Sequence, residues 1–351
     1  MIIRKRLIMS KRKIVGNFLF LVFLFIGMVY YVFHGKDMAK IMDQISNANM
    51  FYWICAVICV IMFIGCESVI IFYLMRNIRQ KIKLTHCFLY SFIGFFFSCI
   101  TPSASGGQPA QVYFMRKDNI PVEISTLVLM IVTITYKMVL IALGIGVLIA
   151  RPQQILHSIA PAKGIFCLGL ILNIVVVGFM IFMIFDTTLA KHILNNVIEF
   201  LSSFKVIKKT EKLNIRVHTA IEKYKDAASY FRRNKVVVWN VFLISVLQRL
   251  FLFYVTYLVY KSFGLRGTGF LTIIFLQGVI SVAVDMLPFP GGVGISEKLF
   301  LLIFTPIFGH ITLPAMVVSR GLSYYTELLL SALLTAVAYF RMVLDRREEI
   351  K

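Results

Sequence analysis

Residues 51–75 read FYWICAVICVIMFIGCESVIIFYLM, a run of 25 residues in which Glu67 is the only charged side chain. A helix of about 20 apolar residues is long enough to cross the hydrocarbon core of a membrane. Runs of similar length and composition occupy residues 14–33, 122–150, 163–185, 236–260 and 313–340. The sequence therefore predicts an all-α, polytopic integral membrane protein with about six spanning helices.

The composition of the whole chain agrees with this fold class. Of 351 residues, 59% are hydrophobic and 15% are charged, whereas soluble domains carry about a quarter charged residues. We expect one membrane domain over residues 1–351, with helical halves at 14–185 and 236–340 joined by a basic connector at 186–235. The run at 14–33 is too long for a signal peptide and lacks a cleavage site of small residues, so it is expected to remain as a helix.

Two further apolar regions are interrupted by proline and glycine. Residues 86–115 are broken at 101–109 (TPSASGGQP), and residues 268–310 are broken at 287–294 (LPFPGGVG). Such sequences stop helices, and a nine-residue arm rises only about 13 Å, less than half of a hydrocarbon core. The pattern predicts two re-entrant hairpins, which would form an inverted repeat with a substrate site near the midplane. Ordinary loops between short helices are the alternative.

The distribution of basic residues predicts the orientation. With the N-terminus inside, 27 Lys and Arg residues fall on the inner side and six on the outer side, and four lie within apolar runs. This asymmetry predicts a cell-membrane protein whose termini, 76–83 loop and 186–235 connector face the cytoplasm. It also accounts for the net charge of +21 without nucleic acid as a partner. The amphipathic pieces 195–205 and 221–233 either contact anionic headgroups or form a solvated loop.

Ionisable side chains within apolar runs are functional candidates, because burying charge in hydrocarbon is costly. The chain has four acids and four bases of this kind: Glu67, Asp285, Glu297, Glu327, Lys137, Arg249, Lys298 and Arg320. They either form structural ion pairs or line a cavity that receives a lipid phosphate. Arg320 and Glu327 are seven residues apart, which predicts that they share one helix face. We expect Arg320 to hold a phosphate against the second break, with Glu297 and Glu327 shaping the pocket.

The two breaks supply further candidate binding groups. A helix N-terminus offers free amides and a positive dipole to an anion. In both breaks, glycines stand where the helix after the break is expected to begin. The candidates are Gly106, Gly107, Gln108, Gln111, Gly291, Gly292 and Ser296. The chain carries no P-loop, His/Cys metal cluster or nucleophile elbow, so we expect no cofactor, no metal and no catalytic residue.

At these breaks the sequence resembles the membrane domain of lysylphosphatidylglycerol synthases, which also occurs in stand-alone, flippase-like membrane proteins. The stretches 101–113 (TPSASGGQPAQVY) and 287–297 (LPFPGGVGISE) carry the resemblance, together with Arg320 in the last long helix. Some branches have an acidic and a basic residue where this chain has Gln108 and Gln111. In two-domain members the membrane part is implied to move aminoacylated phosphatidylglycerol between leaflets, while a soluble domain, which this chain is expected to lack, transfers the amino acid.

Three functions follow as hypotheses. The first is a translocator of an anionic or aminoacylated phospholipid or a related lipid-linked headgroup, with membrane phospholipids as partners. The second is an enzyme, a phosphatidylglycerol lysyltransferase that works with a separate aminoacyl-lipid synthetase or modifies lipids within the membrane. The third is a non-catalytic membrane partner. The absence of a soluble domain argues against the enzyme, and the charged residues within the membrane argue against a purely structural partner.

Overall fold

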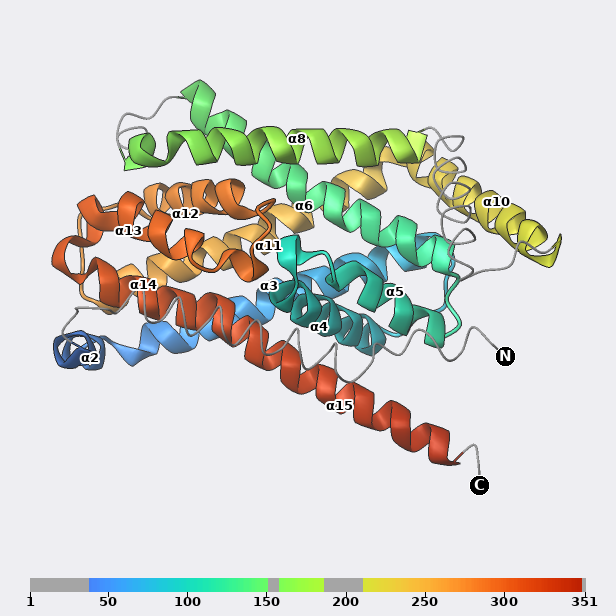
Figure 1. Ribbon diagram of the computed structural model, residues 1–351, viewed down its shortest axis with the longest axis horizontal. Coiled ribbons are helices and arrows are strands. Elements are labelled where there is room, and N and C mark those ends of the chain that lie inside the picture. The colour runs from blue at the N-terminus through green and yellow to red at the C-terminus, as the bar shows by residue number, and fades with distance from the viewer. Residues whose placement is uncertain (1–37, 151–157, 186–210, 349–351) are drawn as a thin grey trace.

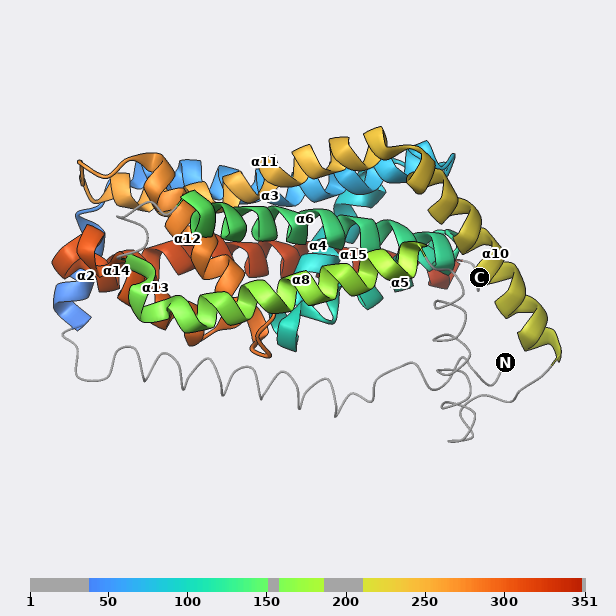
Figure 2. The same ribbon diagram turned by 90° about the horizontal axis from the view of Figure 1, so that it is seen from above.

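The structure is a computed structural model that describes residues 38–150, 158–185 and 211–348 (Figures 1 and 2). Every regular element in these ranges is a helix, which confirms the predicted all-α class. The expected span at 14–33 and the amphipathic piece at 195–205 lie outside the described residues.

Four long helices confirm four of the predicted spans. They are α3 (Met50–Asn77), α6 (Val122–Ala150), α8 (Lys163–Phe185) and α11 (Lys235–Ser262). Even the 23 residues of α8 rise about 35 Å, more than the roughly 30 Å of a hydrocarbon core. All four are apolar enough to cross a membrane.

The last predicted span is a continuous helical path with a change of geometry inside it. It consists of α14 (Thr312–Arg320), a π-helical turn η6 (Gly321–Tyr325) and α15 (Thr326–Glu348). Before it, α13 (Ile295–Phe308) ends at Gly309, whose φ of 58° is left-handed and so favours glycine. The chain turns there through the 3-10 turn η5 (Gly309–Ile311), so that α14 returns from the end toward which α13 runs (Figure 1).

The first interrupted region forms a hairpin of two short helices. Helices α4 (Leu84–Ile100) and α5 (Gly107–Lys117) flank the 3-10 turn η2 (Pro102–Ala104). Their 17 and 11 residues rise about 25 Å and 16 Å, so neither crosses a full hydrocarbon core. The two arms pack closely at Gly107, where a Cβ atom would lie 2.1 Å from the Ser98 hydroxyl.

The second interrupted region has the same construction. Helices α12 (Phe270–Val284) and α13 flank the 3-10 turn η4 (Pro290–Gly292), and each rises only about 21–22 Å. The two hairpins approach from opposite ends of the molecule, and their tips meet near its centre (Figure 1). The Ser103 hydroxyl donates a hydrogen bond to the Leu287 carbonyl across this junction, at 3.2 Å. Opposite entry is the arrangement expected of an inverted repeat.

Several basic segments gather at one end of the molecule. The amphipathic helix α10 (Glu211–Arg233) lies there, at the same end of the molecule as the end of α15 (Figures 1 and 2). The α3–α4 loop and the turn after α5 lie at the same end, while α2 (Met38–Ser46) lies at the opposite end (Figure 1). Of the segments that the charge count assigns to one side, those that the structure describes therefore share one end. That this end faces the cytoplasm stays a prediction.

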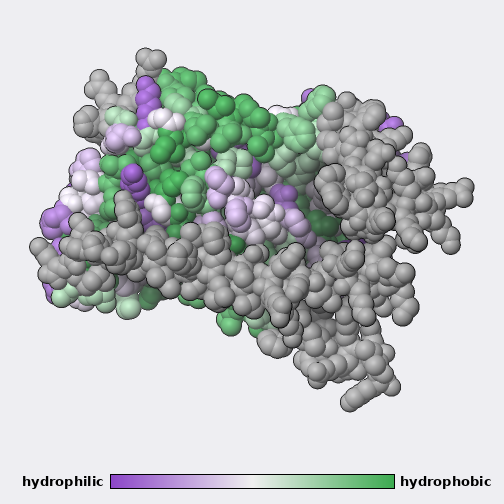
Figure 3. All heavy atoms as spheres, viewed as in Figure 1, coloured by the Kyte–Doolittle hydropathy of each residue, from purple (hydrophilic) through white to green (hydrophobic). Residues whose placement is uncertain are grey.

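Apolar side chains cover much of the outer surface of the long helices. Exposed examples include Ile58 on α3, Val175 and Phe179 on α8, and Leu243 on α11. The face over α8 is mostly hydrophobic, and hydrophilic residues lie toward the left end and near the middle of the view (Figure 3). Apolar residues at the surface of a helix bundle require lipid as the surrounding solvent, so this is a membrane protein.

Candidate functional site

A cavity of about 260 Å³ lies where the two hairpin tips meet. Both hairpins contribute to its wall, together with α3, α6, α11, η6 and α15. Its polar and aromatic lining residues are Phe63, Glu67, Phe95, Ser98, Cys99, Ser103, Gln108, Gln111, Thr133, Tyr136, Arg249, Asp285, Phe289, Tyr324 and Glu327. The cavity is the place predicted from the two breaks, near the centre of the helix bundle.

Arg249 is the cation of this cavity. Its guanidinium lies over the rings of Tyr136 and Phe63, at 4.4 Å and 5.5 Å from the ring centroids. Its Nε is buried and donates no hydrogen bond to any described residue. No residue in the described ranges forms an ion pair with the guanidinium. A buried charge without an anionic partner is costly, so this guanidinium is available to an anion that enters the cavity.

Two carboxylates share the cavity with Arg249. Glu67 accepts a hydrogen bond of 2.9 Å from the Gln111 side-chain amide, which joins α3 to α5. Glu327 lies with Oε1 3.6 Å from the Cys99 thiol, which joins α15 to α4. Both carboxylates interact electrostatically with Arg249. One cation and two acids therefore face a common space formed by helices that are distant in sequence.

Lys137 and Asp285 form a buried ion pair at the edge of this cavity. Lys137 is only 2% exposed, and its ammonium also donates to the Asn173 side-chain oxygen at 3.2 Å. Asp285 lines the cavity, whereas Lys137 does not. The pair joins α6 to the first residue after α12 and neutralises the charge of Asp285.

Arg320 lies behind the cavity wall. Its Nε donates to Glu297 Oε1 at 2.8 Å, and its Nη2 donates to the Gly291 carbonyl at 3.0 Å. Its guanidinium also lies 4.6 Å from the Tyr324 ring centroid. Gly291 and Tyr324 line the cavity, but Arg320 and Glu297 do not. Arg320 therefore stabilises the second hairpin tip through its contacts with Glu297 and Gly291.

The expectation that Arg320 and Glu327 share a helix face assumes a regular α-helix between them, and the described path is not regular there. The intervening η6 is a π turn, in which hydrogen bonds span five residues instead of four. A separation of seven residues therefore does not complete two turns here. Among the described residues, the ion-pair partner of Arg320 is Glu297.

Several backbone amides at the tips already have partners within the protein. The Gly106 amide donates to the Thr101 hydroxyl at 2.9 Å, and the Gly292 amide donates to the Phe289 carbonyl at 3.1 Å. The Gly294 amide donates to Glu297 Oε2 at 2.6 Å, which caps the start of α13. These three amides are occupied within the protein, so they are not free to bind an anion.

The structure brings together some of the predicted residues and separates others. Eight of them line the cavity: Glu67, Gln108, Gln111, Arg249, Asp285, Gly291, Gly292 and Glu327. Six others do not: Gly106, Gly107, Lys137, Ser296, Glu297 and Arg320. Lys298 is exposed and does not line the cavity.

Aromatic and small polar residues of the wall were missed in the sequence. Tyr136 and Tyr324 stand in apolar helices, where an aromatic residue is typical of a packed core. Tyr324 packs so closely on Gly291, whose φ is 57°, that a Cβ atom there would lie 2.1 Å from the ring.

Among the described residues no cluster of three or more metal-ligating side chains occurs.

These features define an α-helical membrane protein with a charged cavity at the junction of two broken hairpins. The family model of the lysylphosphatidylglycerol synthase TM region matches residues 17–331. The chain therefore belongs to this family, as its resemblance predicted, and the match covers the membrane domain alone. A search of the curated proteins finds no match for this chain.

Proposed function

We propose that the protein is a translocator that carries the headgroup of an anionic or aminoacylated phospholipid across the membrane through the central cavity. The observation that carries the proposal is Arg249, a partly buried guanidinium without an ion-pair partner among the described residues, at the meeting point of two hairpins. A guanidinium stays charged in a low dielectric and matches phosphate oxygens in a bidentate manner.

The charges of the cavity favour an aminoacylated headgroup. Arg249 suits the lipid phosphate, while Glu67 and Glu327 suit the ammonium groups of an attached lysine. The family description names lysylphosphatidylglycerol, a lipid that combines these two kinds of charge. A volume of about 260 Å³ is below that of pockets for drug-sized ligands, so a headgroup enters while the acyl chains stay in lipid.

The opposed hairpins provide a route from both leaflets. Passage requires the tips to part toward one side at a time, as in transporters built from inverted repeats. The hydrogen bond from Ser103 to Leu287, which joins the two tips, is weak compared with the ion pairs behind the tips. In this proposal the basic end faces the cytoplasm of a cell-membrane protein, and a separate synthetase makes the aminoacylated lipid.

Reconstitution tests the proposal directly. The full chain is placed in liposomes that carry fluorescent phosphatidylglycerol or lysylphosphatidylglycerol, and transfer between leaflets is followed by chemical quenching from outside. Arg249→Gln should insert and melt like the wild type but lose transfer by about tenfold or more, because a hydrogen bond to a charged group contributes about 1.5–3 kcal/mol.

Lys298→Gln is the matched control, since it removes a cation of an apolar region that does not line the cavity. It should transfer lipid at the wild-type rate. Equal transfer by the wild type and Arg249→Gln would exclude this cavity as the route. A wild type that transfers neither lipid faster than empty liposomes would refute the translocator.

A further inference from the structure

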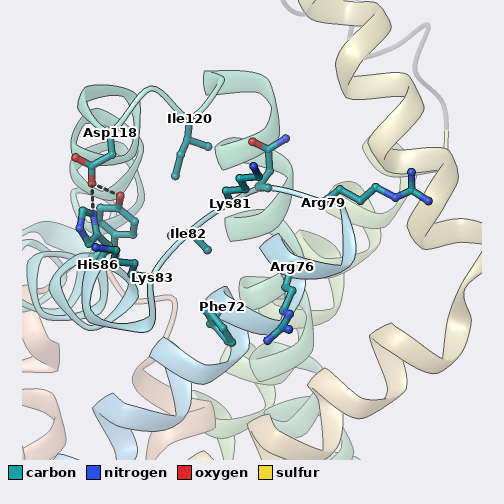
Figure 4. A pocket seen from close by; sticks show the side chains of 11 residues that line it. Phe72, Arg76, Arg79, Lys81, Ile82, Lys83, His86, Asp118 and Ile120 are labelled. Carbon is teal, nitrogen blue, oxygen red and sulfur yellow. Dashed lines mark hydrogen bonds and ion pairs between the residues drawn. The ribbon is translucent and has the colours of Figure 1, made fainter.

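A second pocket, of about 680 Å³, lies at the basic end of the molecule, outside the central cavity. It is formed by the end of α3, the α3–α4 loop, the start of α4 and the turn after α5. Figure 4 shows Arg76 and Arg79 on one side of this pocket and His86 with Asp118 on the other. Nothing in the proposed translocation requires this pocket.

Four cations of the pocket have no anionic partner among the residues that the structure describes. Arg76, Arg79, Lys81 and Lys83 line it within eight residues of sequence, and none forms an ion pair or side-chain hydrogen bond with any described residue. Arg76 makes a cation–π contact with Phe72, at 5.9 Å from the ring centroid. The pocket therefore carries a concentrated positive charge.

The carboxylate in the pocket is occupied. Asp118 accepts from His86 Nδ1 at 2.9 Å and from the Tyr90 hydroxyl, so it joins the start of α4 to the end of α5. Figure 4 shows these contacts on the side away from Arg79. Asp118 thus shapes the pocket without neutralising the arginines.

The loop that carries the cations has a fixed backbone. The amide of Gln80 donates to the Met75 carbonyl at 3.0 Å, which closes the end of α3 in the manner of a Schellman motif. Arg79 occupies the left-handed position of this motif, with φ of 58°, where glycine is usual. The left-handed conformation is unfavourable for a residue with a side chain, yet Arg79 occupies this position and its guanidinium lines the pocket.

Apolar side chains form part of the remaining wall. Phe72, Ile82 and Ile120 line the pocket beside the cations, at the point where the apolar helix α3 ends. A phosphate attached to acyl chains matches this combination, because its charge meets the cations while its glycerol and first methylenes meet the apolar walls. A freely soluble phosphate would use the cations alone.

We propose that this pocket binds the phosphate of an anionic phospholipid in the leaflet at the basic end, as a lipid site separate from the central cavity. The site is independent of translocation. It recognises a phosphate monoester or diester through Arg79 and Lys81, and it does not require an aminoacyl group.

Native mass spectrometry of the delipidated full chain tests the site. The protein is titrated with phosphatidylglycerol and, for comparison, with zwitterionic phosphatidylcholine. Arg79→Gln/Lys81→Gln should weaken phosphatidylglycerol binding by about tenfold or more, on the scale of lost charge-assisted hydrogen bonds. Lys163→Gln/Arg266→Gln removes the same charge from exposed positions at the opposite end of the molecule, and it should change binding less than about twofold, as expected for distant exposed charges.

The comparison is repeated in an Arg249→Gln background, where the loss should persist if the site is separate from the cavity. Equal weakening by the two double variants would mean general surface charge and would overturn the proposal. Displacement of the lipid by excess glycerol phosphate, with the same affinity as the lipid, would assign the pocket to a soluble anion and would overturn the lipid assignment. Binding that is unchanged in Arg79→Gln/Lys81→Gln would also refute it.

Discussion

Removing the guanidinium of Arg320 should destabilise the protein, because the Glu297 carboxylate would then be buried without its counter-ion. The side chain of Glu297 is 2% exposed and that of Arg320 is 16% exposed. Breaking a buried ion pair by removing one partner costs about 3–5 kcal/mol. The amide of Gly294 still donates to Glu297, so we expect Arg320→Ala to fall near the lower end of this range.

Arg320→Lys should cost less. A lysine keeps the charge but cannot donate to Glu297 and to the Gly291 carbonyl in the geometry of a guanidinium. We expect a loss of about 1.5–3 kcal/mol, the scale of one hydrogen bond to a charged group. In Glu297→Gln/Arg320→Met both charges are absent and the volumes are nearly kept, so this variant should recover at least about half of the stability that Arg320→Ala loses.

The measurement is the free energy of unfolding in mixed micelles, followed by the fluorescence of Trp53 and Trp239. Lys298→Ala is the control, since it removes an exposed cation from the same hairpin. Arg320→Ala protein as stable as the wild type would refute the reasoning. A double variant that is less stable than Arg320→Ala would show that packing at the second tip, and not the unpaired acid, sets the cost.

Three further predictions concern other parts of the molecule. Lys137→Met should lower the free energy of unfolding by about 3 kcal/mol, because Asp285 would lose its counter-ion. Lys137→Met/Asp285→Asn should recover most of this loss. A Lys137→Met variant as stable as the wild type would contradict the prediction. In a background without the native cysteines, an impermeant maleimide added to intact cells should label a cysteine at Arg266 but not one at Arg79, and the reverse pattern would invert the topology. The purified chain should form no lysylphosphatidylglycerol from charged tRNA and phosphatidylglycerol, because the sequence shows no catalytic motif, and radiolabelled product would establish a synthase.

The fold could be predicted largely from local sequence. An apolar run of sufficient length must form its backbone hydrogen bonds internally when it crosses lipid, so a helix is its only solution. This physical constraint is why α3, α6, α8 and α11 coincide with the predicted runs. Proline and glycine likewise mark the two breaks, because they cannot continue a helix at low cost.

The pairing of charges could not be predicted in the same way. Lys137 and Asp285 are 148 residues apart in sequence, and only the packing of α6, α8 and α12 brings them together. The prediction that linked Arg320 to Glu327 used regular α-helical geometry, which the π turn at 321–325 changes. Sequence identifies which charges lie in the membrane, but tertiary packing decides which of them neutralise each other.

The pairings distinguish the four cations predicted within apolar runs. Lys137 and Arg320 each hold a carboxylate, and both ion pairs join segments behind or beside the cavity wall. Lys298 is exposed, where its ammonium can reach polar surroundings along a flexible stem. Arg249 differs from all three, because it faces the cavity with two aromatic rings for neighbours and no ion-pair partner in the described chain. Among the described residues Lys137 and Arg320 form ion pairs, whereas Arg249 forms none and has Glu67 and Glu327 only as electrostatic neighbours in the cavity. The phosphate of an anionic ligand would give this guanidinium the direct partner that offsets the cost of burying it.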